Sequence, residues 1–322
     1  MSYFAAWWNV ENLFDLENSG ERTEKLQRTL ANELRGWDET LLSKKIEQLS
    51  TIVNRMNEEK GPDLLGICEV ENRSVLDRLK EKIDSASRRN YDVIHADTQD
   101  ERGIDVAFLY DKTKFELEPD KVFFHIIVKR VATREIVQVN FKSKATGNRI
   151  VLVGNHWPSR MGGQLESEPF RLIAGETLAY FNQRIQEVHG GDTSIITMGD
   201  FNDEPFNRSI VEHALGTPDK DKVIRAKTAP RLYNLMWSFA AKARGTFYFD
   251  GFNLLDQIMV SRGMLNSEGK FGIDPNFPQI LDFEELKKNG KPRKFGRPSD
   301  SKGVDEQGYS DHYPIAVKIV EE

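Results

Sequence analysis

Runs of apolar residues with the length of a β-strand recur along the chain. They cover residues 3–10, 64–70, 105–110, 136–141, 150–154, 195–199, 254–260 and 315–320. Several of these runs are continuous rather than alternating, which is typical of strands that are covered on both faces. The pattern therefore predicts sheets with little solvent-exposed face.

Two segments between these runs have the periodicity of amphipathic helices. One stripe of the first helix carries Leu42, Ile46, Leu49, Val53 and Met56. Asp38 precedes this stripe and is expected to be its N-cap. The second helix covers about 166–188 and is expected to bury Phe170, Ala174, Thr177, Phe181, Ile185 and Val188. Because residues 91–155 are almost all strand, the mixture favours packed sheets with helices outside over a simple doubly wound fold.

No internal repeat and no linker rich in proline or serine divides the chain of 322 residues. A chain of this length with 39% hydrophobic residues can bury one large core, so we expect a single domain over residues 1–322. Residues 267–308 are polar, rich in glycine, proline and charge, and without periodicity. They are expected to form a long loop or lid.

The overall charge limits the classes of partner. The formal net charge is -6, so no global basic field draws the protein to nucleic acid or to an anionic membrane. The single cysteine, Cys68, excludes an intrachain disulfide and a cysteine-rich zinc site. We find no secretory signal pattern and no apolar run of about 20 residues, and we expect a cytoplasmic protein without a membrane span. No protein partner is indicated.

Side chains that can bind a metal or move a proton lie at the ends of the apolar runs, where an α/β sheet opens to solvent. Asn9 and Glu69 end the first two runs and supply the hard oxygen ligands that suit Mg²⁺ or Mn²⁺. His156 follows the run 150–154, and Pro158 stops that strand. His156 could act as a general acid or donate a hydrogen bond to a phosphate oxygen.

Two further pairs of polar residues lie in or next to apolar runs. Asp200 and Asn202 come after the run 195–199, and the alternation of a strand would point both side chains to one side. Asp256 stands among apolar neighbours, and a buried carboxylate normally has a partner. His312 is the candidate partner.

Taken in order, these residues resemble the endonuclease/exonuclease/phosphatase superfamily, which includes deoxyribonuclease I-like nucleases. The resemblance rests on Trp-Asn-Val-Glu-Asn-Leu-Phe at 8–14, Glu69, Asn-His at 155–156, Gly-Asp-Phe-Asn at 199–202, Asp256 and Ser-Asp-His at 310–312. One such match alone would be weak, but the ordered set covers essentially the whole chain. The resemblance implies an α/β (α+β) four-layer sandwich of two packed, mostly antiparallel β-sheets flanked by helices, with the site at one edge of the sheets.

The resemblance also implies roles for the residues. The ligands of a divalent cofactor, Mg²⁺ or Mn²⁺, would be Asn9, Glu69 and Asp311. The catalytic set would comprise His156, Asp200, Asn202, Asp256 and His312. Within this set Asp256 would orient His312. Either His312 or Asp200 could be the general base.

Hydrolysis of a phosphoester substrate is the expected reaction, and a phosphodiesterase or nuclease-like enzyme is the first hypothesis. A phosphomonoesterase that acts on a small phosphorylated metabolite or a lipid headgroup is the alternative, because the same site could serve it. A non-catalytic binding module is a remote third reading, since every core position carries a chemically competent residue. Nucleic acid is a possible substrate that the negative net charge does not favour.

Basic residues near the expected site could add substrate contacts. Arg102 precedes a strand in a segment that resembles a substrate-side segment of the family. The polar loop carries the densest basic cluster of the chain, formed by Lys287, Lys288, Lys291, Arg293, Lys294, Arg297 and Lys302. This cluster could contact a polyanion, although charge runs in loops are usually only solvated.

Overall fold

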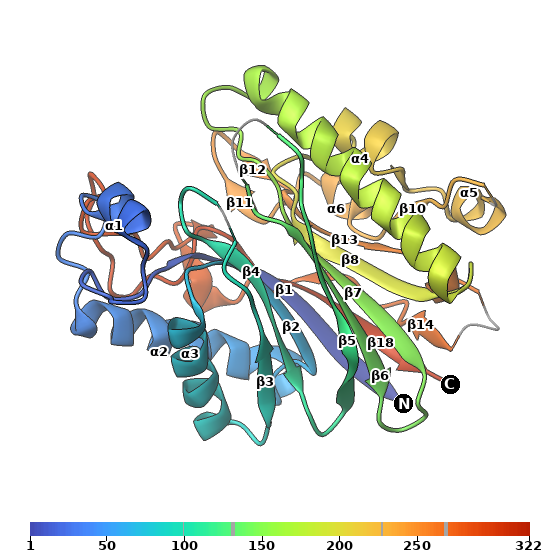
Figure 1. Ribbon diagram of the computed structural model, residues 1–322, viewed down its shortest axis with the longest axis horizontal. Coiled ribbons are helices and arrows are strands. Elements are labelled where there is room, and N and C mark those ends of the chain that lie inside the picture. Colours follow the sequence, from blue (N-terminus) through green and yellow to red (C-terminus); the bar gives the residue numbers. More distant parts are fainter. Residues whose placement is uncertain (99, 130–132, 227, 267–269) are drawn as a thin grey trace.

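The structure is a computed structural model that describes residues 1–98, 100–129, 133–226, 228–266 and 270–322. Within these residues, two seven-stranded sheets pack against each other, with helices outside (Figure 1). The first sheet has the spatial order β14 (Phe271–Ile273), β18 (Ile315–Glu321), β1 (Ser2–Leu13), β2 (Leu64–Val70), β4 (Asp105–Asp111) and β3 (Tyr91–Ile94), and β15 (Gln279–Ile280) also pairs with β18. The second sheet has the order β5 (Phe115–His125), β6 (Ile136–Ser143), β7 (Arg149–His156), β8 (Ser194–Asp200), β13 (Asp256–Val260), β10 (Leu232–Asn234) and β9 (Gly216–Thr217).

Most neighbouring strands run antiparallel. Among the described residues the parallel pairs are β1 with β2, β7 with β8, and β9 with β10. Two short hairpins lie apart from the large sheets: β11 (Phe247–Tyr248) with β12 (Phe252–Asn253), and β16 (Lys287–Lys288) with β17 (Lys291–Pro292). The predicted pair of mostly antiparallel sheets is confirmed.

The helices have the bounds α1 (Glu24–Leu30), α2 (Glu39–Glu59), α3 (Arg73–Ala86), α4 (Gln164–His189), α5 (Lys220–Arg225) and α6 (Trp237–Ala240). The longest helices, α2, α3 and α4, form the two outer layers, and α1 lies at one end of the molecule (Figure 1). α2 and α3 lie on the outer side of the first sheet, and α4 crosses the outer side of the second. Across the described chain, no helix combines the length and apolar character needed to cross a bilayer.

Strand alternation divides the core. In β7, Ile150 and Leu152 belong to the cluster between the sheets, whereas Val151 and Val153 belong to the cluster beneath α4. A strand with apolar residues at every position can fill both layers, which explains the continuous apolar runs. Each fully buried aliphatic side chain contributes about 1.5–3 kcal/mol to this packing.

Helix α2 follows the sequence prediction. The carboxylate of its N-cap, Asp38, accepts a hydrogen bond of 3.0 Å from the backbone N–H of Leu41. The whole predicted apolar stripe is buried.

The predicted buried face of α4 is partly wrong. Phe170 is 40% exposed and Val188 is 73% exposed, and Thr177 and Phe181 are only half-buried. Their places beneath the helix are taken by polar residues. These are Arg171, Asn182 and Gln186. Arg171 Nε lies 2.9 Å from a carboxylate oxygen of Asp203, and this buried ion pair allows an arginine where the pattern predicted a hydrophobic residue.

Most of the described part of the segment 267–308 lacks regular secondary structure, as expected of a loop, but the segment is tied to the first sheet by short strands. It contains β14 and β15, which pair with β18, and the hairpin β16–β17. Phe271, Leu286 and Phe295 are buried in the main core. Residues 267–269 lie outside the described part of the chain. The described residues of the segment are attached to the first sheet through β18 and cover part of that sheet's edge.

Candidate active site

The candidate site lies at the edge where four strands end. β1 and β2 are parallel, as are β7 and β8, so their carboxyl ends meet at one edge. Glu69, His156 and Asp200 occupy these strand ends, and Asn9 lies where the regular pairing of β1 with β2 is interrupted. The antiparallel β13 starts there with Asp256, which pairs in register with Asp200. The topology therefore brings together residues that are far apart in sequence.

The backbone turns sharply at two of the predicted site residues. Glu69 has a φ of 65° and Asn202 a φ of 51°, both in the left-handed region. Glu69 lies in an irregularity of the pairing between β2 and β4, between Cys68 and Val70. A left-handed residue other than glycine costs about 1–3 kcal/mol, and such strain concentrates at functional sites. The strain therefore supports a functional assignment of this edge.

The sequence suggested that strand alternation would carry Asn202 to the same side as Asp200. In the structure, Asn202 lies beyond the end of β8 and does not continue the alternation. The strand ends at Asp200, whose Oδ1 accepts a 2.9 Å hydrogen bond from the backbone N–H of Asn202. The Asn202 side chain donates to the carbonyl oxygen of Trp157 at 3.0 Å. Arg160 Nε donates to the Asn202 carbonyl at 2.7 Å. Asn202 is therefore held by a tight turn beside Asp200.

Asp256 and His312 form the buried pair that the sequence suggested. Nδ1 of His312 lies 2.6 Å from Oδ2 of Asp256. The same oxygen accepts a hydrogen bond of 2.6 Å from the Thr246 hydroxyl, and Oδ1 accepts one of 3.2 Å from Trp7 Nε1. Trp8 Nε1 donates to the carbonyl oxygen of His312 at 2.9 Å. These contacts fix both the carboxylate and the ring.

Asp200 occupies the centre of the cluster. Its Oδ2 accepts a hydrogen bond of 3.1 Å from Asn9 Nδ2. The same oxygen lies 3.9 Å from Nε2 of His156 and 3.9 Å from Nε2 of His312. Burial raises the pKa of Asp200 to about 6; the charge of His312 opposes this increase and that of Asp256 adds to it. Asp200 can therefore exchange a proton near neutral pH.

The two histidines have opposite electrostatic surroundings. Burial works against protonation of His312, yet the carboxylates of Asp256, Asp200 and Asp311 raise its pKa well above the ordinary value. For His156, burial and the nearby Arg134 and Arg102 lower the pKa well below the ordinary value. His312 is thus a cation at neutral pH. His156 is a neutral imidazole, which suits a hydrogen-bond donor better than a general acid.

The oxygen groups expected to bind a metal also lie in this cluster. Glu69 Oε2 accepts the backbone N–H of Asn12 at 3.0 Å, while its Oε1 lies 3.7 Å from His156 Nε2. Burial acts to raise the pKa of Glu69, but Arg102, His312 and Arg134 together hold it below the ordinary value. An ionised carboxylate with one free oxygen fits a hard divalent cation.

Asn9 and Asp311 complete this set. Asn9 Oδ1 accepts the backbone N–H of Glu11 at 3.0 Å and keeps a second lone pair. An oxygen of Asp311 lies 4.0 Å from His312 Nε2, and its side chain is 37% exposed. Asp311 therefore forms the solvent side of the site.

A buried pair that sequence reasoning missed lies next to Asp311. Lys45 Nζ lies 3.9 Å from Glu11 Oε2 and donates to the carbonyl oxygen of Tyr309 at 2.6 Å. Glu11 also accepts the backbone N–H of Phe295 at 2.7 Å. Burial and the charge of Asp311 raise the pKa of Glu11 to about 8. The pair joins α2, β1 and the segment that leads into Asp311 and His312.

Two arginines bring positive charge to the Glu69 side of the site. Arg102 is 44% exposed, and its guanidinium lies 3.8 Å from Glu69 Oε1. Arg134, which the sequence analysis did not select, is buried and donates to Asp100 at 3.1 Å and to the Trp157 carbonyl at 2.9 Å. Its Nε has no hydrogen-bond partner among the described residues. Both arginines favour binding of an anion.

The basic cluster of the 267–308 segment is mostly neutralised by its own neighbours. Lys288 and Arg293 pair with Asp305, and Lys294 and Arg297 pair with Asp300. Lys287 pairs with Asp282 and Glu284, and Lys291 lies 3.8 Å from the centre of the Tyr248 ring. These partners weaken the case for contact with a polyanion.

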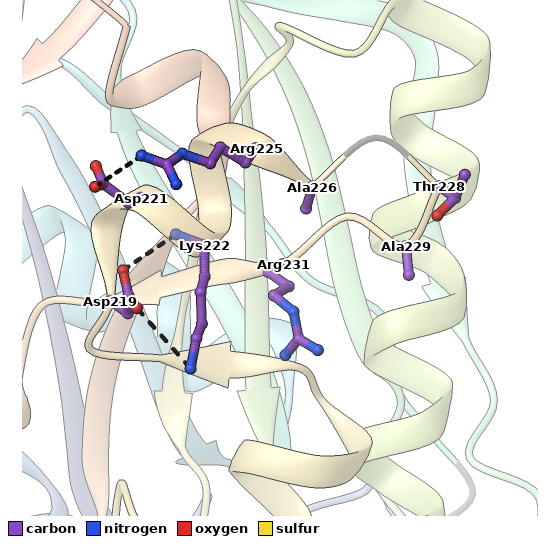
Figure 2. Close-up of a pocket in the computed structure, with 8 residues that line it drawn as sticks. All are labelled: Asp219, Asp221, Lys222, Arg225, Ala226, Thr228, Ala229 and Arg231. Carbon is purple, nitrogen blue, oxygen red and sulfur yellow. Dashed lines mark hydrogen bonds and ion pairs between the residues drawn. The ribbon is translucent and has the colours of Figure 1, made fainter.

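A surface depression of about 810 Å³ beside α5 is lined by none of these site residues (Figure 2). Its walls carry Lys222 and Arg225, which pair with Asp219 at 3.9 Å and with Asp221 at 3.4 Å. The charges that line the depression are thus partly balanced within it. The residues that can bind a metal or transfer a proton therefore lie at the sheet edge and not in this depression.

Comparison with known proteins agrees with this geometry. The chain matches the model of the Endonuclease/Exonuclease/phosphatase family over residues 4–321. No curated protein sequence matches it. The solved structures that match include an endonuclease/exonuclease/phosphatase family protein from Bacteroides thetaiotaomicron, with 17% identity and a TM-score of 0.59 over 100% of this chain and 98% of that chain.

Two further solved structures cover 99% of this chain and 99% of their own. The mannosyl-6-phosphatase Bt3783 of Bacteroides thetaiotaomicron VPI-5482 has 16% identity and a TM-score of 0.59. Humanized TDP2 of D. rerio has 15% identity and a TM-score of 0.60. At these identities the likeness establishes a shared fold.

Proposed function

Because the chain belongs to the endonuclease/exonuclease/phosphatase family, we propose that it hydrolyses phosphodiesters with the help of a divalent metal ion, Mg²⁺ or Mn²⁺. The observation that carries the proposal is the Asp256–His312 pair, which lies beside Asp200 and next to the oxygen groups of Asn9 and Glu69. A proton donor, a carboxylate for the water and a set of hard oxygen ligands are thus within reach of one phosphate.

The metal ligands would be Asn9, Glu69 and Asp311. Burial raises the pKa of Asp311, and the nearby charge of Glu69 adds to the increase; a cation between the two carboxylates would relieve their repulsion. When bound, the ion would neutralise charge on the non-bridging phosphate oxygens.

The protein's own groups would handle the proton transfers. His312, held through Nδ1 by Asp256, would present a protonated Nε2 to the phosphate or to the leaving oxygen. Asp200 would orient the attacking water and accept its proton. Asn202 and the neutral His156 would donate hydrogen bonds to phosphate oxygens.

A phosphomonoesterase activity is the second candidate. Arg102 and Arg134 add positive charge on the Glu69 side, which would favour the extra negative charge of a monoester. One structural neighbour with the same fold is a mannosyl-6-phosphatase.

The two candidates are separated by a substrate panel. It contains a bis-aryl phosphodiester, supercoiled plasmid, single-stranded DNA and an aryl phosphomonoester, each with Mg²⁺, Mn²⁺ or EDTA. We expect diester turnover that EDTA and His312→Ala both abolish. His213→Ala is the matched control, because His213 pairs with Glu176 away from the site. Turnover of the monoester alone would replace the first proposal by the second, and activity that survives both EDTA and His312→Ala would overturn the site assignment.

A further inference from the structure

A second group of metal-capable side chains lies between β3 and β4. His95 directly follows β3, Asp105 is the first residue of β4, and Asp97 belongs to the connection between these antiparallel neighbours. One ligand atom from each of the three lies within 4.8 Å of the others. None of the three belongs to the site proposed above.

The buried histidine has a nitrogen without a hydrogen bond. Only 2% of the His95 side chain is exposed, and its Nε2 has no hydrogen-bond partner among the described residues. This nitrogen faces Asp105 Oδ2 at 3.4 Å. An N–H···O hydrogen bond is normally 2.7–3.2 Å long, so the contact is too long for a good one. Two ligands of one tetrahedral zinc ion, each about 2.0–2.1 Å from the metal, are separated by about 3.3 Å, which the observed distance matches.

The carboxylate of Asp105 has no lysine or arginine partner among the described residues, and the nearest group that can carry a positive charge is His95. Its side chain is 2% exposed, and Oδ1 accepts hydrogen bonds from the backbone and the hydroxyl of Thr98. Within the described residues no lysine or arginine pairs with Asp105 or Asp97. Arg134, the buried cation of this region, is paired with Asp100. A buried carboxylate without a lysine or arginine partner is costly.

A cavity lies beside the two carboxylates of the group, although His95 does not line it. A cavity of about 340 Å³ is lined by Asp97, Thr98 and Asp105, among others. The Asp97 side chain is 78% exposed and lies 3.9 Å from Nδ1, the other ring nitrogen of His95, so it would turn to reach an ion bound at Nε2. A hydrated ion could enter from this side and keep water at its remaining positions.

We propose that His95, Asp97 and Asp105 bind a second divalent cation, of the zinc class, at a site separate from the catalytic one. One imidazole and two carboxylates favour a first-row transition metal over Ca²⁺ or Mg²⁺. The ion would bind at the connection between β3 and β4. This connection also carries Asp100, which accepts a hydrogen bond from Arg134, and Arg102, whose guanidinium lies near Glu69. The cation would thereby stabilise the arginine side of the active site.

The test is a titration of metal-free protein with Co²⁺, followed by its visible absorption, without substrate. Glu69→Gln is used as the background so that the proposed catalytic site binds weakly. In this background we expect one remaining Co²⁺ equivalent, which Zn²⁺ displaces. Asp97→Ala should weaken the remaining site at least 10-fold, and His95→Gln should abolish it.

Two further variants make the result decisive. His213→Gln removes another histidine that pairs with a carboxylate, Glu176 at 2.8 Å, and should leave the Co²⁺ signal unchanged. Asp97 is exposed, so its alanine variant should fold even if His95→Gln does not. The same Co²⁺ affinity in Asp97→Ala and in its background, or no remaining equivalent in that background, would overturn the second site. Neither result depends on phosphodiester turnover, so failure of this proposal is distinct from failure of the proposed function.

Discussion

Nδ1 of His312 lies 2.6 Å from Oδ2 of Asp256, in a buried contact that joins the start of β13 to the residues before β18. The contact leaves Nε2 of the same ring 3.9 Å from Asp200. A ring fixed in this way needs no reorganisation to present Nε2 to a substrate, and such preorganisation is a large part of catalysis.

Asp256→Asn should reduce kcat for the preferred phosphoester about 100-fold or more, because the amide removes the charge that favours the His312 cation. Steady-state kinetics, with a melting curve to verify folding, measures this effect. Asp192→Asn is the control, since Asp192 is exposed and pairs with Arg262. A kcat within threefold of the unmodified protein would show that the mechanism does not need the charge of Asp256.

Arg102→Ala should raise KM about 10-fold while kcat changes little. The guanidinium is 44% exposed and 3.8 Å from Glu69, so its charge remains available to an anionic substrate. Loss of an interaction of about 1.4 kcal/mol gives that factor. Arg28→Ala, which removes an exposed arginine paired with Glu24, should leave KM unchanged. If kcat fell and KM did not, Arg102 would act in the chemical step instead.

Lys45→Met should lower the free energy of unfolding by about 1–3 kcal/mol, because it leaves the buried carbonyl oxygen of Tyr309 without its hydrogen bond and removes the amine beside Glu11. Chemical denaturation measures the change. The neighbouring Lys44→Met breaks only a surface pair with Glu47 and should change stability by less than about 0.5 kcal/mol. Equal effects of the two variants would show that the buried pair does not stabilise the segment before Asp311.

Asp305 predicts a pH-dependent contribution to stability. Its hydrogen bonds to Arg293 and Lys288 lower its pKa to about 2, below the value of about 3.9 in an unfolded chain. A lowered folded-state pKa stabilises the protein above the unfolded-state pKa, and this stabilisation is lost as pH falls toward 2. Asp305→Asn should therefore cost about 1 kcal/mol at pH 7 and progressively less from pH 5 downward. A cost that stayed constant between pH 7 and pH 3 would contradict this reading of the pair.

Much of the fold follows from apolar patterning. β2 has the predicted bounds, Leu64–Val70, and α2 begins after the predicted N-cap, Asp38. Both segments have local signals that agree with their tertiary surroundings: a continuous apolar run in one and a capped stripe in the other. The ordered motifs identified the family correctly, and the eight selected residues meet at one sheet edge.

The failures concern polar residues whose partners are distant in sequence. Arg171 is buried beneath α4 because Asp203 is there to pair with it, and no local pattern indicates that contact. Arg134 was missed because its two partners, Asp100 and the carbonyl oxygen of Trp157, are brought to it by the fold and are not close in sequence. Lys45 was detectable, since it lies on the apolar stripe of α2 between Leu42 and Leu49, a position where a lone cation requires a buried partner.

The most direct test of the metal-dependent site is hydrolysis of a bis-aryl phosphodiester by protein stripped with EDTA and then titrated with Mg²⁺ or Mn²⁺. We predict that the stripped protein is inactive and that one or both ions restore activity to the unmodified protein and to Glu81→Gln, which alters an exposed carboxylate away from the site. Glu69→Gln should need at least about 10-fold more metal, because an amide is a weaker ligand than the ionised carboxylate. Full hydrolysis in excess EDTA, or recovery of Glu69→Gln at the same metal concentration, would contradict the assignment of this cluster as a metal-dependent phosphodiesterase site.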